Sequence, residues 1–184
     1  TVADSDPTYG GSRAYNFDGA NDYIDCGDIL NAPTEWSISL WVDRRGTSVN
    51  NAGLAGRAYL YDGYTVIGRH LSGHPQIVQH KPDNLTAPNT LKDGWTHLVG
   101  LYSSSDGELR IYEDGVLTAQ KSGQSSPSPV ASSISWEIGA AYDGFAPLQG
   151  RMDDIRAYTR VLTQAEITLL ASVRGFTSGA GTQI

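Results

Sequence analysis

The stretch "ELRIYEDGVLTAQ", residues 108–120, decides the fold class. In it, Asp114 and Gly115 separate two runs that contain apolar residues at short intervals. An Asp-Gly pair fits the positive φ angles of a two-residue turn that joins antiparallel strands. Before the turn, Leu109 and Ile111 alternate with polar residues, as in a strand that buries one face. The stretch therefore predicts a β-hairpin in an antiparallel sheet.

Short runs of the same kind recur along most of the chain, separated by turn residues rich in Gly, Asp and Ser. The region between residues 44 and 63 is expected to be irregular. Uneven spacing and long connections favour an all-β, two-sheet antiparallel sandwich of jelly-roll type over a closed barrel. Strands are expected at residues 13–19, 21–27, 35–45, 64–70, 75–81, 94–104, 108–120, 135–142 and 150–158.

One segment near the end has the pattern of a helix instead. Thr163 precedes Glu166 by three residues, which is the spacing of a capping box. Ile167 and Leu170 then repeat at helical spacing. We expect a single short C-terminal helix at residues 164–172.

The totals limit both the organisation and the function of the chain. Its 184 residues fit one domain, with a lead-in or linker at 1–13, a domain at 14–176 and a polar tail at 177–184. A net charge of −7 without a basic run argues against nucleic acid as a partner. No apolar stretch approaches the ~20 residues that span a bilayer, so membrane insertion is not expected. The single cysteine, Cys26, excludes an intrachain disulfide.

Four stretches occur in an order that resembles a known family. They are "YNFDGANDYIDCG", "EWSISLWV", "DGWTHLVGLYSSSDGELRIYEDGVLTAQ" and "WEIGAAYDGFAPLQGRMDDIRAYTRVLTQAEI". Together they resemble the laminin-G-like, concanavalin-A-like lectin/glucanase jelly roll over about residues 14–171. The resemblance implies one convex and one concave sheet, with the first and last strands adjacent. It also implies a binding or adhesion module more often than an enzyme, and a structural calcium ion near the chain ends.

The closing stretch "QGRMDDIRAY", residues 149–158, contains two neighbouring acids. Regular alternation predicts Asp153, Ile155 and Ala157 on one face, with Asp154 paired to Arg156 on the other. A carboxylate at the buried edge needs hydrogen-bond donors or a cation, so Asp153 is a candidate metal ligand.

Calcium takes ~6–8 oxygen ligands, more than one strand supplies. Because the resemblance places the opening element beside the closing strand, we expect Asp18, Asp22 and Asp153 to hold a structural calcium. The alternative is that these acids accept backbone amides in the turn and pair with Arg151 or Arg156.

Exposed aromatic rings are the residues expected to bind a ligand, because sugar-binding surfaces stack rings on sugar faces. Two Gly-containing stretches, "RAYLYDGY" and "AAYDGF", carry such rings where the rim of a sheet is expected. The candidates are Tyr59, Tyr61, Tyr64, Tyr142 and Phe145. Trp41, Trp95 and Trp136 are interpreted instead as core residues.

Catalytic and zinc sites are not expected. Laminarinase-type enzymes of the same jelly roll place their carboxylates on one face of a strand, in the pattern Glu-x-Asp-x-x-Glu. Glu108 and Glu113 are an odd number of residues apart and so are predicted on opposite faces. The histidine pair of "HLSGH" would need a helix, which its Gly73 and the following Pro75 oppose. His97 is expected to make a structural hydrogen bond.

The sequence therefore predicts a non-catalytic recognition module that binds carbohydrate or a glycan-bearing surface. Its expected place is extracellular, on a cell surface or on a virion. Two alternatives stay open: a structural, adhesion or decoration domain that contacts other protein subunits of a surface assembly, and a polysaccharide-cleaving enzyme.

Overall fold

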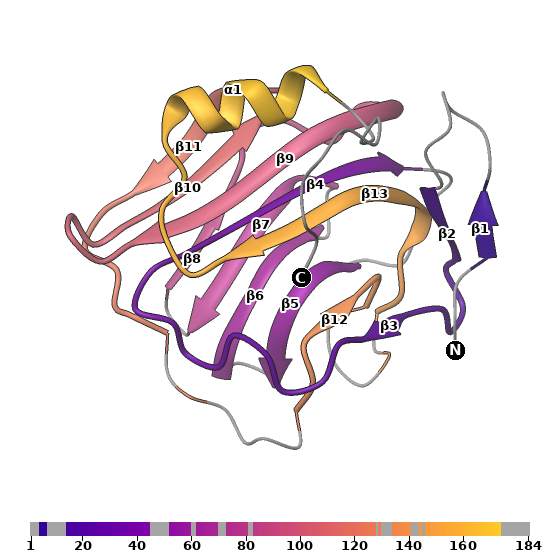
Figure 1. Ribbon diagram of the computed structural model, residues 1–184, viewed down its shortest axis with the longest axis horizontal. Coiled ribbons are helices and arrows are strands. Elements are labelled where there is room, and N and C mark those ends of the chain that lie inside the picture. Colours follow the sequence, from indigo (N-terminus) through magenta and orange to yellow (C-terminus); the bar gives the residue numbers. More distant parts are fainter. Residues whose placement is uncertain are drawn as a thin grey trace, which may run out of the picture.

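Two antiparallel sheets and one helix make up the part of the chain that the structure describes (Figure 1). The structure is a computed structural model. It describes residues 4–6, 14–44, 52–59, 62–69, 73–80, 83–127, 129, 134–140, 144 and 146–173. The predicted all-β, two-sheet jelly roll with a short C-terminal helix is confirmed.

The larger sheet has seven strands among the described residues. Strands β2 and β13 lie side by side, so the first and last long strands are neighbours, as the resemblance implied. In spatial order the strands are β1 (Asp4–Asp6), β2 (Ala14–Asp18), β13 (Gln149–Tyr158), β4 (Trp36–Arg44), β9 (Gly94–Ser103), β10 (Glu108–Glu113) and β11 (Val116–Lys121).

The smaller sheet has six strands within the same described ranges. Every ladder in it is antiparallel. In spatial order the strands are β3 (Ile24–Asp25), β12 (Glu137–Ile138), β5 (Gly53–Tyr59), β6 (Asp62–Arg69), β7 (Pro75–His80) and β8 (Asp83–Thr86).

Three strands were not predicted from the sequence. Strand β5 lies within 44–63, which was expected to be irregular, so that prediction is wrong. Its sequence "GLAGRAY" has few residues that favour strands. The segment takes an extended conformation because it pairs with β12 on one side and with β6 on the other. Strand β1, inside the predicted lead-in, and strand β8 are likewise short segments held by a neighbouring strand.

The hairpin that opened the sequence argument forms as predicted. Strands β10 and β11 are joined by Asp114 (φ 49°) and Gly115 (φ 84°), both in the left-handed region. The Asp114 carboxylate also accepts the backbone N–H of His97 at 2.9 Å, which ties the turn to β9.

The predicted helix α1 spans Gln164–Ser172 and begins with the predicted capping box. Thr163 Oγ1 accepts the Glu166 N–H at 3.3 Å, and Glu166 Oε2 accepts the Thr163 N–H at 2.8 Å. Hydrogen bonds from Arg160 and then from Thr163 lower the pKa of Glu166 from 4.5 to about 2. The carboxylate therefore remains charged and keeps the cap closed at any ordinary pH.

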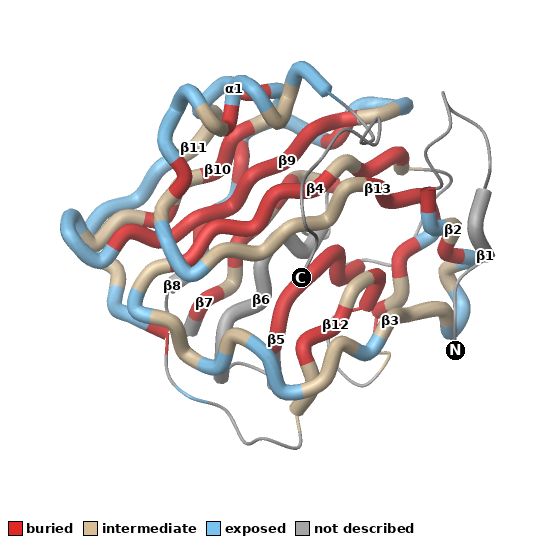
Figure 2. The backbone as a smooth tube through the Cα atoms, viewed as in Figure 1, coloured by how far each residue is buried: buried red, intermediate tan, exposed pale blue. Residues whose placement is uncertain are grey.

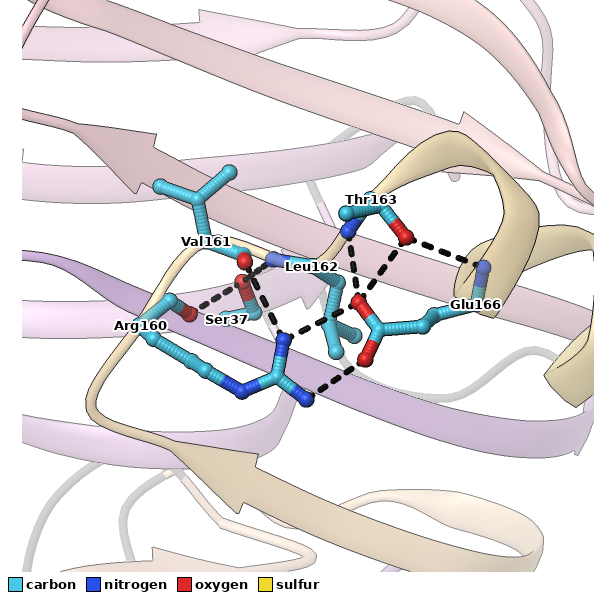
Figure 3. Close-up of polar contacts among 6 residues, drawn as sticks. All are labelled: Ser37, Arg160, Val161, Leu162, Thr163 and Glu166. Carbon is cyan, nitrogen blue, oxygen red and sulfur yellow. Dashed lines mark hydrogen bonds and ion pairs between the residues drawn. The ribbon is translucent and has the colours of Figure 1, made fainter.

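Helix α1 lies against the outer face of the seven-stranded sheet, across β9 and β10 (Figure 1). Ile167 and Leu162 pack there against Val99, Leu101 and Tyr112. Polar contacts hold the segment before the helix (Figure 3). In them, Ser37 Oγ donates to the Arg160 carbonyl at 2.8 Å and accepts the Leu162 N–H at 2.9 Å.

The main core lies between the two sheets. Trp36, Ile38, Leu40 and Val42 alternate along β4 and all belong to it. Residues of β4 and β9 are buried almost without interruption (Figure 2), because the core covers one face and α1 covers part of the other. The rest of this outer face of the seven-stranded sheet is not covered by α1.

Candidate functional site

A β-bulge in β13 changes which side chains share a face. Asp153 pairs with Trp41 of β4, and Arg156 pairs with Ser39, so three residue steps on β13 oppose two on β4. Asp154, the residue after Asp153, takes φ 49°. One extra residue between two ladder pairs shifts the alternation of every residue that follows.

The predicted face of Asp153 is therefore wrong. Met152 lies in the core, while Ile155 and Ala157 pack against that core from the far side of the bulge. Asp153 instead shares the outer face with Arg156. The sequence argument assumed unbroken alternation, whereas the bulge lets both the acid and the arginine point outward.

Three outer-face residues form a row across β9, β4 and β13. Trp95 pairs with Asp43, which pairs with Arg151. Arg151 donates from Nη2 and Nε to Asp43 Oδ2, at 2.5 and 3.1 Å. Its guanidinium carbon lies 5.2 Å from the centre of the Trp95 ring. Both charges are buried, so pairing and the ring contact hold the guanidinium in one orientation.

The next row contains His97, Trp41 and Asp153. The His97 and Trp41 rings lie 5.2 Å apart at 52°, and His97 Nε2 is 2.9 Å from Ser39 Oγ. The predicted structural hydrogen bond of His97 is thus confirmed. Among the described residues, neither His97 Nδ1 nor Trp41 Nε1 has a hydrogen-bond partner, although both atoms are buried.

Burial lowers the pKa of His97 from 6.5 to about 4, against the opposing effect of Asp114 and Asp154. The imidazole is therefore neutral near pH 7. Asp153 Oδ1 accepts the Asp154 N–H at 2.8 Å, and Arg156 Nε donates to Asp154 Oδ1 at 2.7 Å. The predicted Asp154–Arg156 pair is confirmed, and both of its side chains are partly buried.

We call this set the outer-face patch: Asp43, Trp95 and Arg151, then Trp41, His97 and Asp153, then Asp154 and Arg156. Trp41 and Trp95 are partly exposed rather than core residues, so that interpretation is wrong for both, while Trp136 is in the core as expected. Trp36 and Trp41 are five residues apart, so alternation along a strand places them on opposite faces. Nothing in the local sequence showed that Trp95 would lie diagonally beside it.

The predicted aromatic residues lie largely outside what the structure describes. Tyr59 ends β5 and Tyr64 lies in β6, with their side chains not described. Tyr61, Tyr142 and Phe145 lie outside the described residues.

Two groups of aromatic residues were predicted to bind a ligand, one at 59–64 and one at 142–145. The described residues in or next to these groups lie at opposite ends of β5. Ala146, next to Phe145, accepts the N–H of Gly53 at 3.0 Å, at the start of the strand. Tyr59 ends the same strand, about 20 Å away at ~3.3 Å per residue.

The structure does not bring the predicted calcium ligands together. Gln149 pairs with Asp18, and Asp153 lies four residues further along β13, about 13 Å away at ~3.3 Å per residue. Asp22 Oδ2 accepts the Asp18 N–H at 3.0 Å, and Asp18 Oδ1 accepts the Ala20 N–H at 2.7 Å.

A calcium ion bonds oxygens at only ~2.3–2.6 Å, so the three carboxylates do not fit one ion. Within the described ranges, no cluster of three or more His, Cys, Asp or Glu could hold a metal. The hydrogen bonds of the turn match the alternative stated from the sequence, in which the acids accept backbone amides.

Register also places the two glutamates of β10. Glu108 pairs with Ser103 and Glu113 pairs with the core residue Leu98, so the two carboxylates lie on opposite faces, as predicted. Burial raises the pKa of Glu113, while Glu108 is ion-paired to Arg110. They cannot act together on one substrate.

The sheet order and the helix define a two-sheet jelly-roll domain. The family model of the concanavalin A-like lectin/glucanases superfamily matches residues 18–168. The chain belongs to this superfamily. A search of curated proteins found no match.

Several solved structures share the fold. Domain 4 of AbnA, a GH43 extracellular arabinanase from Geobacillus stearothermophilus in complex with arabinotriose, is 21% identical with a TM-score of 0.72, covering 93% of this chain and 81% of that one. A SAP-like pentraxin from Limulus polyphemus is 14% identical with a TM-score of 0.58, covering 85% and 80%. The binding domain of botulinum neurotoxin DC in complex with SialylT is 11% identical with a TM-score of 0.64, covering 93% and 44%.

In the described part of the chain, no helix has the length and apolar character needed to cross a membrane.

Proposed function

We propose that this domain is a non-catalytic carbohydrate-binding module that holds a neutral glycan on the outer-face patch. The observation that carries the proposal is the diagonal placement of Trp41 and Trp95 on neighbouring strands, beside fixed carboxylates and guanidinium groups. Sugars present C–H groups on their ring faces and hydroxyls at their edges. A surface that offers indole faces and charged hydrogen-bonding groups together matches both.

The two indoles are diagonal neighbours, since Trp41 pairs with His97, two residues after Trp95. Diagonal residues of antiparallel strands are ~7–8 Å apart, within reach of aromatic side chains. This spacing allows the two rings to contact neighbouring sugar units of one chain. We therefore expect an oligosaccharide to bind more tightly than a single sugar.

The polar groups of the patch are already oriented. Asp43 holds the buried Arg151 against the Trp95 ring. Asp154 holds the more exposed Arg156, so a ligand hydroxyl meets a guanidinium whose rotamer is set. Less side-chain entropy is then lost on binding. Because each guanidinium is paired with a carboxylate, the patch offers little attraction for an anionic sugar.

Two structures with the same fold support a glycan as ligand, because one contains arabinotriose and the other SialylT. The arabinanase is also extracellular, which supports the proposal that this domain works outside a cell or on a surface. The separation of Glu108 and Glu113 supports a module without hydrolytic activity.

The test is calorimetric titration with arabinotriose and a panel of neutral oligosaccharides. Trp41→Ala and Trp95→Ala are each expected to weaken binding at least about tenfold, the effect of losing a central aromatic contact. Leu169→Ala is the matched control, because Leu169 is exposed on α1 and is not a residue of the patch. No released reducing ends are expected in the same mixtures.

The tyrosines predicted from the sequence provide the competing site. If Tyr59→Ala, Tyr61→Ala and Tyr64→Ala abolish glycan binding and the tryptophan variants keep it, the proposed location is wrong. If no glycan in the panel binds the wild-type domain, the function itself is wrong.

A structural or adhesion domain is the second candidate, and exposed apolar side chains beside the helix favour it. Leu117 pairs with Tyr112 on the helix side of the hairpin and is 40% exposed, and Leu169 is 65% exposed on the neighbouring helix. Gln164 Nε2 donates to the Gly115 carbonyl at 2.8 Å, which joins hairpin and helix into one surface. A cross-linker placed by Leu169→Cys should then reach a neighbouring subunit in the intact assembly, and a lack of cross-links would exclude this role for the surface.

A further inference from the structure

Two side-chain amides lie on the outer face of the seven-stranded sheet, next to the outer-face patch. They belong to Asn16 of β2 and Gln149 of β13, and we call them the amide pair. Asn16 pairs with Arg151 across the β2–β13 ladder, and Gln149 lies two residues before Arg151 on the same face. Phe17 lies in the core, so alternation along β2 directs Asn16 outward. Asn16 therefore extends the first row of the patch by one strand (Figure 1).

The hydrogen-bonding groups of the amide pair are not used within the described part of the chain. Asn16 is half-buried and Gln149 is exposed, and neither side chain has a hydrogen-bond partner among the described residues. The base of Gln149 is nevertheless fixed, because a Cβ on Gly19 would lie only 2.8 Å from the Gln149 Cβ. The neighbouring Asp18 is occupied, since its Oδ1 accepts the Ala20 N–H at 2.7 Å. The donors and acceptors of the amide pair are thus available to a ligand on this face.

The chemistry of an amide matches that of a sugar edge. An amide carries an acceptor oxygen and two N–H donors, and a sugar hydroxyl both donates and accepts. Asn16 and Gln149 are diagonal neighbours, ~7–8 Å apart, which is within reach of long side chains. Both amides can therefore contact one sugar unit. Asp18 pairs with Gln149 and faces the same way, so its negative charge would repel an acidic sugar and favours a neutral one.

The amide pair lies close to one of the two tryptophans of the patch. Trp95 belongs to β9, three strands from β2, which is ~14 Å at ~4.7–4.9 Å per strand. Its ring extends across Asp43 of β4, since the ring centre lies 5.2 Å from the guanidinium carbon of Arg151. Arg151 is in turn the direct ladder partner of Asn16. The Trp95 ring and the amide pair thus flank the same arginine, so neighbouring units of one glycan chain can contact both.

We propose that the amide pair is a further subsite, which binds the hydroxyls of a third sugar unit while Trp41 and Trp95 contact the first two. This inference rests on the proposed function of the outer-face patch, because it extends the same bound glycan. The chain then lies across the strands, from β4 and β9 towards β2. The site therefore selects neutral glycans of at least three units.

The test is calorimetric titration with arabino-, xylo- and cello-oligosaccharides of two, three and four units. A disaccharide should occupy the two rings, and the third unit should add the contacts of the amide pair. Asn16→Ala and Gln149→Ala should each weaken trisaccharide binding about fivefold, the effect of one neutral hydrogen bond, and leave disaccharide binding unchanged. A general disturbance of the fold would weaken both lengths. Gln120→Ala is the matched control, because Gln120 is an exposed glutamine of β11 at the other edge of the sheet, and it should change neither length.

A measurement on the wild type keeps the result independent of any variant. In ¹⁵N-labelled protein, the trisaccharide should move the side-chain amide signals of Asn16 and Gln149 to saturation, and the disaccharide should leave them in place. The subsite alone is overturned if Trp41→Ala and Trp95→Ala weaken binding while the amide signals do not move and the amide variants bind the trisaccharide as tightly as the wild type. If none of the oligosaccharides binds the wild type, the proposed function fails and the subsite fails with it.

Discussion

Protonation of His97 should control how the stability of this domain depends on pH. His97 is 1% exposed, and its burial lowers its pKa from 6.5 to about 4. The unfolded chain therefore takes up a proton as the pH falls through 6.5, while the folded protein does so only near 4. Because the unfolded state binds more protons in this window, the free energy of unfolding falls as the pH is lowered. The stability that neutral His97 contributes is therefore complete above pH 6.5 and lost below about pH 4.

The size of the loss follows from the separation of the two pKa values, 6.5 and about 4. Each pH unit between them is worth ~1.4 kcal/mol, which gives about 3 kcal/mol for the whole window. The measurement is urea denaturation of the wild type at intervals from pH 7.5 to pH 4.5. The range ends at pH 4.5, the ordinary pKa of Glu166, because below that pH the unfolded chain would protonate this carboxylate and add a second slope.

The decisive comparison is His97→Gln, whose amide can keep a hydrogen bond to Ser39 but cannot take up a proton in this range. Its stability should lose most of the pH dependence that the wild type shows. Ser39→Ala is the matched control, because it removes the hydrogen bond and leaves the histidine. It should lower stability at every pH and keep the slope. If His97→Gln shows the same slope as the wild type, the assignment of the slope to His97 is refuted.

Other predictions concern the patch, the core, the helix cap and the metal, and the first three are measured by chemical denaturation at pH 7. Asp43→Asn leaves a buried guanidinium without its counter-charge and should cost about 3–5 kcal/mol; a loss below 1 kcal/mol would show that the pair is not desolvated. Gly139→Ala should cost about 2–5 kcal/mol, since Gly139 has φ 85° and a Cβ there would lie 2.2 Å from a phenyl carbon of β2; an unchanged midpoint would contradict this. Thr163→Ala should cost about 1 kcal/mol through loss of the cap, and an equal loss in a variant that lacks the helix would contradict that cause. Calcium binding stays a prediction of the sequence: metal-stripped protein should gain melting temperature with calcium, and loss of the gain in Asp22→Asn but not in Asp153→Asn would assign the ion to the turn after β2.

Much of the fold could be predicted because its signals are local. The Asp114–Gly115 turn, the capping box of Thr163 and Glu166, and the alternation of β4 each depend on residues close in sequence. The Asp154–Arg156 pair is local in the same sense, since two residues separate its members. In each case, short-range sterics and hydrogen bonding are enough to specify the conformation.

The candidate site was predictable only in fragments. Asp153 drew attention because an acid in a buried strand needs a partner, but its assigned face was wrong. Trp41 and Trp95 were both interpreted as core residues. Trp95 belongs to a strand more than fifty residues further along the chain, and only the β4–β9 register brings the two indoles together on the outer face.

The sequence by itself determined the kind of fold, the hairpin, the helix and the family. Only the tertiary structure decided the extended conformation of β5, the outward direction of Asp153 and the diagonal pair of tryptophans. The physical reason is that strand pairing is set by contacts between distant segments. A single extra residue in one ladder, such as the bulge at Asp153–Arg156, moves side chains from one face to the other without leaving a mark in the local pattern.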